Sequence, residues 1–313
     1  MRRLFLVAVA AAGFASVTFA EKPSESKYIP TNSPVAIHID AVKLKQNLID
    51  LGVPVEKTFA KAKAEKKLEL DNISRAVIFL ELFPDATNPV APVVVGTMKE
   101  ATAKADLPNL MESTTEATIA GKTCIQSKDK IAGQDAFGIA IDDKTVLFGV
   151  KSIMETLLKA DPKEGDLSKE FEKADLKHDA VIVLAAKPLM IALKEKYGDL
   201  DKQVPPAAES FYLAAKTLEA VTLTVDLSEA TLLNGVFRSD NAEGAEKVKE
   251  ALQGGLALAS FALPQIKQQL GGQLPPEAKP LIDVIEAIVK TSKFKIDGST
   301  VIMTVARPKN FGK

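Results

Sequence analysis

The sequence has one cysteine, no tryptophan and two histidines, and aromatic residues make up only 5 % of its 313 positions. A single cysteine cannot form a disulfide within the chain, so packing alone must stabilise the fold. With so few aromatic side chains, the core must be mainly aliphatic. Two histidines and one cysteine also supply few ligands for a structural zinc site, which usually takes four Cys or His side chains.

The chain also lacks any block of like charge, and its formal net charge is −1. Nucleic-acid binding requires a basic, phosphate-neutralising face, so we expect no nucleic-acid partner. The lysine-rich stretch Ala60–Asp71 mixes lysines with acids at helical spacing. This pattern is typical of a solvated helix face and does not indicate a polybasic membrane patch.

The first twenty residues, MRRLFLVAVAAAGFASVTFA, contain two arginines, an apolar run from Leu4 to about Ala15, and small residues at Thr18 and Ala20. These are the parts of a secretory signal peptide. We therefore expect cleavage near Ala20 and export to the periplasm or the cell exterior. An uncleaved anchor is the alternative, although the apolar run is shorter than the roughly 20 residues of a spanning helix. No later stretch is long and apolar enough to span a membrane.

Short segments recur in the same order in the two halves of the chain, which indicates an internal duplication. The four matched pairs are SPVAIHIDAVKL (33–44) with HDAVIVLAAKPL (178–189), RAVIFLEL (75–82) with EAVTLTVDL (219–227), VVGTMK (94–99) with LNGVFR (233–238), and TIAGKTCI (118–125) with KIDGSTVI (295–302). The spacing of the last pair is larger than that of the others. The second copy is therefore expected to carry an insertion.

The pattern of apolar residues predicts both strands and helices. β-branched and aliphatic runs predict strands at Val35–Ile39, Ala76–Leu82, Pro92–Met98, Ala180–Leu184, Ala220–Leu227 and Thr231–Phe237. Hairpin turns are expected at Asp142-Asp143 and Asp297-Gly298. Helical stripes of apolar residues occur at 55–62, 153–158 and 281–289.

Each copy therefore reads β-α-β-β-α-β-β, and we predict an α+β fold of tandem units, with mainly antiparallel sheets and helices packed on one face. The expected boundaries are a signal peptide at 1–20, a flexible mature N-terminus at 21–30, a first unit at 31–165, a second unit at 166–308 with a helical insertion at about 239–292, and a tail at 309–313. The insertion is apolar and punctuated by Gly and Pro. It is expected to be a helix pair capping the second sheet, or alternatively a mobile apolar lid or docking surface.

Gly121-Lys122-Thr123 resembles the end of a phosphate-binding loop, but Glu116 stands where that loop needs its first glycine. A β-prone stretch also follows it where a helix is required. We therefore expect a hairpin in which Gly121 supplies an unusual backbone conformation. Cys124 matches Val301 of the second copy, so we expect a small buried side chain and not a nucleophile.

The histidines and carboxylates form no recognisable catalytic or metal-binding set. His38 lies in a predicted strand with Asp40 nearby, and His178 precedes the equivalent strand. Neither has a metal-ligand partner at helical or short-loop spacing. Most of the aspartates lie at predicted turns or helix starts, and no serine-hydrolase motif is present. We therefore assign no catalytic, cofactor-binding or metal-binding residue and expect no cofactor.

The layout resembles a family of uncharacterised exported proteins of planctomycete bacteria. The resemblance rests on the opening YIPTNSPVAIHIDAVKL, the strand-turn-strand TIAGKTCIQS, the segment GIAIDDKTVLFGVKSIMETLLKA and the second strand copy AVIVLAAKPL. It covers nearly the whole mature chain. It implies export and a duplicated α+β unit, and it brings no known activity and no catalytic residues.

We therefore predict an exported, non-enzymatic protein that binds or scaffolds in the periplasm or cell envelope. Its partner would be an envelope protein or an apolar small molecule. One alternative is a carrier that holds an apolar ligand between the sheet and the helices of the second unit. The other is a hydrolase with a noncontiguous site near His38 or His178, which requires a histidine within hydrogen-bond reach of a carboxylate or nucleophile.

Overall fold

The computed structural model describes residues 24–311, except 31, 67–69, 83–89, 113, 132, 160–164, 199–203, 206–207, 271–278 and 310. The predicted signal peptide at 1–20 lies outside the described residues. None of the described helices is long and apolar enough to cross a membrane.

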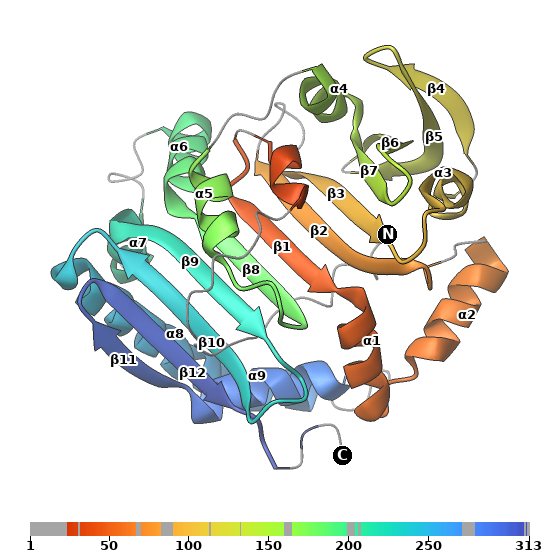
Figure 1. Cartoon of the computed structure of the whole chain (residues 1–313). Coiled ribbons are helices and arrows are strands. Elements are labelled where there is room, and N and C mark those ends of the chain that lie inside the picture. The colour runs from red at the N-terminus through yellow and green to blue at the C-terminus, as the bar shows by residue number, and fades with distance from the viewer. Residues whose placement is uncertain are drawn as a thin grey trace.

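The strands of the described chain join in one antiparallel sheet, in the order β11-β12-β10-β9-β8-β1-β2-β3-β7-β6-β5-β4 (Figure 1). The strands are β1 (Val35–Asp40), β2 (Ile73–Leu82), β3 (Val90–Met98), β4 (Thr115–Ile119), β5 (Lys122–Ile131), β6 (Gln134–Ala140), β7 (Thr145–Val150), β8 (Ala180–Ala185), β9 (Leu218–Val225), β10 (Thr231–Ser239), β11 (Lys293–Asp297) and β12 (Thr300–Ala306). All six strands predicted from the aliphatic runs are present.

Helices are present at the three predicted stripes, 55–62, 153–158 and 281–289, and also at places where none was predicted, such as Asp166–Lys173 and Glu209–Thr217. They are η1 (Ser24–Tyr28), α1 (Ala41–Asp50), α2 (Val55–Lys66), α3 (Ala103–Asp106), η2 (Leu107–Asn109), α4 (Lys151–Lys159), α5 (Asp166–Lys173), α6 (Ala186–Tyr197), α7 (Glu209–Thr217), α8 (Ala242–Leu270) and α9 (Lys279–Thr291), where η marks a 3-10 helix. The predicted α+β class is confirmed. The helix pair expected at about 239–292 consists of α8 and α9, which pack on β10 and β12.

The two units join through their first strands into a continuous sheet. β1 pairs with β8, and Ile37 lies opposite Ile182. On either side of this pair, Ala36 lies opposite Val183 and His38 opposite Val181. These registers are symmetric about the pair Ile37 and Ile182, which lie 145 positions apart, the same spacing as in the first pair of matched segments. This symmetry is expected for two copies related by an approximate two-fold axis.

The fourth repeat match was wrong. The hairpin β11–β12 lies next to β10, and the hairpin at the equivalent place next to β3 is β6–β7, not β4–β5. The hairpin β4–β5 lies further out, at the edge of the sheet, and none of the described strands of the second half forms an equivalent pair. The two segments were matched because their turn sequences are similar. A turn sequence predicts a hairpin but does not show which strand of the sheet that hairpin pairs with.

The two larger cores lie on opposite faces of the shared sheet. On the front face, residues of β1, β2 and β3 pack against α4 and α5, and the Phe79 and Phe171 rings meet edge to face at 5.9 Å. On the back face, β10 and β12 pack against α8 and α9. The change of face is visible in β8, where Val181 belongs to the front core and its neighbour Ala180 to the back core. Figure 1 shows α5 in front of the sheet and α8 behind it.

Part of the segment predicted to be flexible, 21–30, is instead packed against the front face. Ser24–Tyr28 forms η1, and Glu25, Tyr28 and Ile29 are buried. The Glu25 carboxylate accepts from Arg75 Nε at 2.7 Å and from Thr97 Oγ1 at 3.1 Å. These contacts fix the chain on the sheet shortly after the predicted cleavage point.

Candidate functional site

The motif Gly121-Lys122-Thr123 lies at a tight hairpin turn, as predicted. Ala120 and Gly121 connect β4 to β5, and both have positive φ, 51° and 75°. Two such residues are typical of the turns that join two-residue hairpins. Cys124 follows on the front face with 1 % exposure, and burial raises the pKa of its thiol. The predicted burial of Cys124 is therefore confirmed, and its surroundings favour an inert thiol.

His38 is a core residue of the front face. It is 4 % exposed, and burial is the main cause that lowers its pKa to about 4. Its Nδ1 atom has no hydrogen-bond partner among the described residues. Asp40 does not orient it, because the Asp40 carboxylate accepts the backbone N–H groups of Val42 and Lys43 and caps α1. This geometry gives no support to a hydrolase centred on His38.

His178 belongs to a polar cluster that connects the two units. Its Nδ1 contacts Asp226 Oδ2, and Asp226 Oδ1 accepts from Lys43 Nζ at 2.5 Å. Lys43 also lies 3.3 Å from Asp179, whose buried carboxylate accepts from the Asn47 amide and, at 2.7 Å, from Leu227 N. The hydrogen bond to Asp226 raises the pKa of His178, while hydrogen bonds from His178 and Lys43 outweigh burial and lower that of Asp226.

This cluster satisfies one condition for a hydrolase, a histidine in contact with a carboxylate. Among the described residues, however, its hydrogen bonds involve carboxylates, a lysine, an amide and backbone groups, and no hydroxyl or thiol takes part. Lys43 and Asn47 lie on α1 of the first unit, whereas Asp179 and Asp226 flank strands of the second. The arrangement therefore fastens α1 onto the second half of the sheet.

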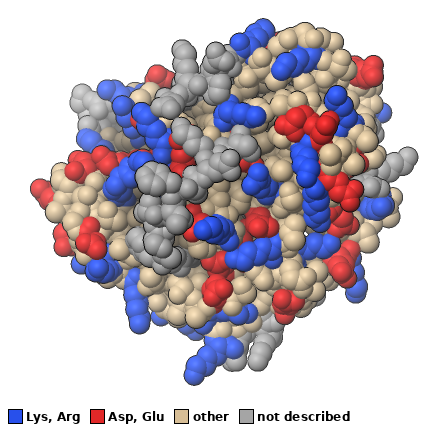
Figure 2. Space-filling model, viewed as in Figure 1, with Lys and Arg blue, Asp and Glu red and all other residues tan. Residues whose placement is uncertain are grey.

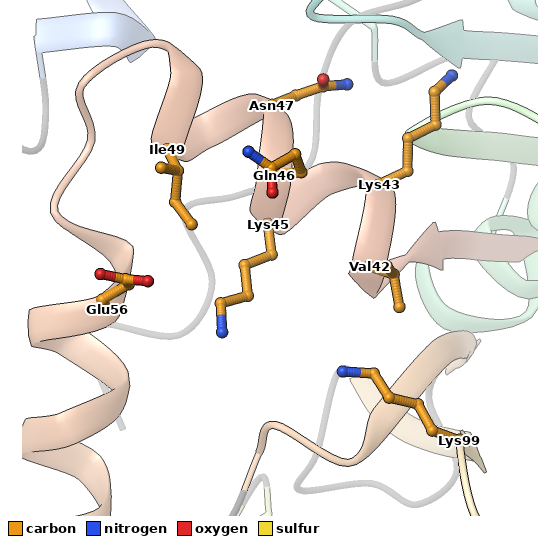
Figure 3. A pocket seen from close by; sticks show the side chains of 8 residues that line it. All are labelled: Val42, Lys43, Lys45, Gln46, Asn47, Ile49, Glu56 and Lys99. Atoms are coloured by element: carbon orange, nitrogen blue, oxygen red, sulfur yellow. The ribbon is translucent and has the colours of Figure 1, made fainter.

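A hollow of about 520 Å³ opens beside α1 (Figure 3). Lys45 from α1 and Lys99, the residue after β3, extend toward it, and Gln46 of α1 and Glu56 of α2 also line it. Lys45 is already paired with Asp71 at 2.6 Å, and Lys99 Nζ donates to the Asp71 carbonyl. Most of the lining residues are polar or charged, and the two lysines are already paired with Asp71, which does not match the wall of an apolar carrier site.

The space between the second half of the sheet and the helices α8 and α9 contains packed side chains. Val248 and Ala251 of α8 and Ala287 of α9 are buried against Val301 and Met303 of β12. This packing argues against a ligand held between the sheet and these helices, the place expected from the sequence.

A partly exposed apolar surface lies elsewhere, on the back face of the central strands. Eight partly exposed residues form two adjoining rows there, which we call the apolar floor: Leu184, Val35, Leu80 and Pro92 in one row, and Ile182, Ile37, Ile78 and Val94 in the other. Among the described residues, these side chains are not part of any of the buried core clusters. The floor faces away from the viewer in Figure 1, on the side of α8.

A second apolar surface lies on the neighbouring helices. Six of the eight large apolar side chains that are well exposed among the described residues lie on α6, α7 and α8: Ile191, Tyr197, Phe211, Leu213, Leu258 and Phe261. Phe261 is 77 % exposed and Leu258 64 %. By contrast, the face shown in Figure 2 carries acidic and basic side chains interspersed over both halves of the molecule.

Comparisons with known proteins give only a distant structural likeness. No protein-family model and no curated protein matches the chain. Among solved structures, crystal form III of TP0453, a spirochete protein, has 13 % identity and a TM-score of 0.45, and the match covers 90 % of this chain and 93 % of that one. Crystal form I of the same protein has 10 % identity and a TM-score of 0.42, with 91 % and 92 % covered.

Proposed function

We propose that the protein is an exported, non-catalytic binding protein that takes up an aliphatic small molecule on the apolar floor. The observation that carries this proposal is the exposure of two complete rows of aliphatic side chains in the middle of the sheet. The front face of these strands is buried under helices, and an antiparallel sheet can leave its other face in water, but that face is then usually polar. A contiguous, partly exposed apolar surface in this place is typical of a binding site.

The chemistry of the floor defines the ligand class. Its side chains carry no hydrogen-bond donor or acceptor, so a ligand with polar atoms at this surface would lose its hydrogen bonds to water without replacement. The floor spans four strands, about 19 Å, and its two rows are about 7 Å apart. This strip matches a narrow aliphatic chain. It is small for a protein partner, because a stable interface usually covers about 800 Å² on each side.

Export is the second part of the proposal. It rests on the predicted signal peptide and on the resemblance to exported planctomycete proteins. The place of the ligand differs from the sequence-based alternative: the floor uses strands of both units and lies beside the helices of the second unit, not beneath them.

Binding of a fluorescent fatty acid to the purified mature protein tests the proposal. We expect saturable binding by the wild type and at least tenfold weaker binding by the double variant Ile78→Thr/Val94→Thr. Both substitutions keep a β-branched side chain and so preserve strand propensity, while each adds a hydroxyl to the floor.

Two matched variants locate the binding. Val42→Thr changes an exposed β-branched residue on α1, away from the floor, and Phe261→Ser removes an aromatic side chain of α8 that is 77 % exposed. Both are expected to bind like the wild type. Equal binding by the floor variant, or a loss confined to Phe261→Ser, would contradict the floor as the site. Absence of binding by the wild type would contradict the ligand class.

A further inference from the structure

The middle of α8 carries an exposed apolar stripe on the side that faces away from the sheet. Gly254, Ala257, Leu258 and Phe261 follow one another at i, i+3, i+4 and i+7, and all four are exposed. No charged residue occurs between 251 and 266. The solvent side of a surface helix is usually charged or polar, so this stripe has the composition of a contact face.

The order of small and large residues makes the stripe complementary to itself. If two copies of α8 lie antiparallel, with a two-fold axis between positions 257 and 258, Gly254 of each copy faces Phe261 of the other. Ala257 then faces Leu258. Each large side chain meets a small one, and a Cβ atom built at Gly254 would meet nothing within 4 Å in the monomer. The open space above Gly254 can thus receive an aromatic ring.

We propose that this stripe is the interface at which two copies of the chain associate, through an antiparallel pair of α8 helices. A two-fold dimer brings the same surface of both copies together, so self-complementarity is the property it requires. The neighbouring helix extends the surface at Phe211 of α7, which is 38 % exposed. The Phe211 ring lies against α8 at Gly255, where an added Cβ would be 3.4 Å from it.

The size of the surface sets the expected strength. A fully buried aromatic side chain covers about 150–250 Å², but Phe211 is already more than half buried in the monomer, so the exposed parts of Phe261, Leu258 and Phe211 give an interface below the about 1,200 Å² of stable complexes. We therefore expect a weak, reversible dimer that forms at about 100 µM and above. The proposal is independent of the apolar floor, which lies on the sheet and shares none of these residues.

Sedimentation equilibrium of the mature protein tests the dimer. Gly254→Leu is the key variant, because it improves helix propensity and fills open space in the monomer, yet it occupies the place of the opposing Phe261. We expect Gly254→Leu and Phe261→Gly each to weaken dimerisation at least tenfold. The double variant Gly254→Phe/Phe261→Gly exchanges the large and small positions and is expected to recover most of the affinity.

Cysteine cross-linking tests the orientation. Ala257 lies next to the proposed axis, so Ala257→Cys is expected to form an intermolecular disulfide much faster than Val42→Cys, a comparably exposed control on α1. The native Cys124 is buried and does not interfere. A monomeric wild type at 200 µM would overturn the proposal. So would a dimer that survives Gly254→Leu, or equal cross-linking of the two cysteine variants; either would indicate another partner for the stripe or another interface.

Discussion

Acid should destabilise the protein through His38, and the repeat supplies the variant that isolates this effect. His38 is 4 % exposed, and burial lowers its pKa from 6.5 to about 4. Because the folded pKa is lower than the unfolded one, the neutral ring stabilises the fold fully above about pH 6.5. This contribution is lost as the pH falls toward 4, because the unfolded chain then binds a proton that the folded chain does not.

The size of the effect follows from the two pKa values. A difference of about 2.5 pKa units corresponds to about 3 kcal/mol in total, since each unit is worth 1.36 kcal/mol. At pH 5 about 2 kcal/mol of this is already lost. In the second copy, the position equivalent to His38 at the 145-residue spacing is Val183, which is completely buried. His38→Val therefore places a residue that this sheet already accepts.

Urea unfolding of the wild type and His38→Val at pH 8, 6.5 and 5 measures the difference. The substitution leaves a smaller side chain, which lowers stability by a pH-independent amount. We expect the wild type to lose about 2 kcal/mol more than His38→Val between pH 8 and pH 5. Carboxylates elsewhere titrate in both proteins and cancel in the comparison. Parallel pH profiles would show that the ring is protonated in the folded state, and the reasoning would fail.

Three further predictions concern the polar cluster around Asp179, which connects the two units, and the hairpin β4–β5. Asp179→Ala should lower the free energy of unfolding by about 3–5 kcal/mol, because it leaves buried donors without an acceptor. Asp71→Ala is the control: it removes an exposed ion pair and should change the free energy of unfolding by less than about 1 kcal/mol. Chemical unfolding measures both. The thiol of Cys124 should react with a disulfide reagent only in denaturant; rapid reaction in buffer would contradict its burial. Ala120→Val should lower the unfolding temperature while Ala120→Gly does not, because a φ of 51° is costly for a β-branched residue.

The sequence was informative about local structure because local signals are sufficient there. The strand at Val35–Ile39, the turn at Asp142 and the helix before β11 were all predicted from spacing and turn chemistry. Asp142 accepts hydrogen bonds from the backbone of Lys144 and Thr145, as expected for an aspartate at a turn. The second hairpin turn lies one position later than predicted, at Gly298 and Ser299, because Asp297 still pairs with Thr300.

The long-range arrangement could not be predicted in the same way. Lys43 and Asp226 are 183 positions apart, and nothing in their local sequences indicates that they meet. The local sequence also does not show which face of β1 is covered: His38 is buried, whereas its neighbour Ile37 is partly exposed. Which face is covered depends on the helices that pack there, and these come from distant parts of the chain.

The difference between the two copies explains why the apolar floor exists. In the second unit, the segment between β10 and β11 forms α8 and α9, which cover the back face of that half. In the first unit, the segment between β3 and β6 forms α3, η2 and the hairpin β4–β5, which extends the sheet at its outer edge. Among the described residues, the back face of β1, β2 and β3 therefore has no equivalent helix pair. Because β8 joins β1 directly, Ile182 and Leu184 complete the rows begun by Ile37 and Val35. The duplication thus creates a surface that one copy could not form alone. The divergence of one connecting segment leaves it without a covering helix pair among the described residues, and the proposed binding rests on that difference.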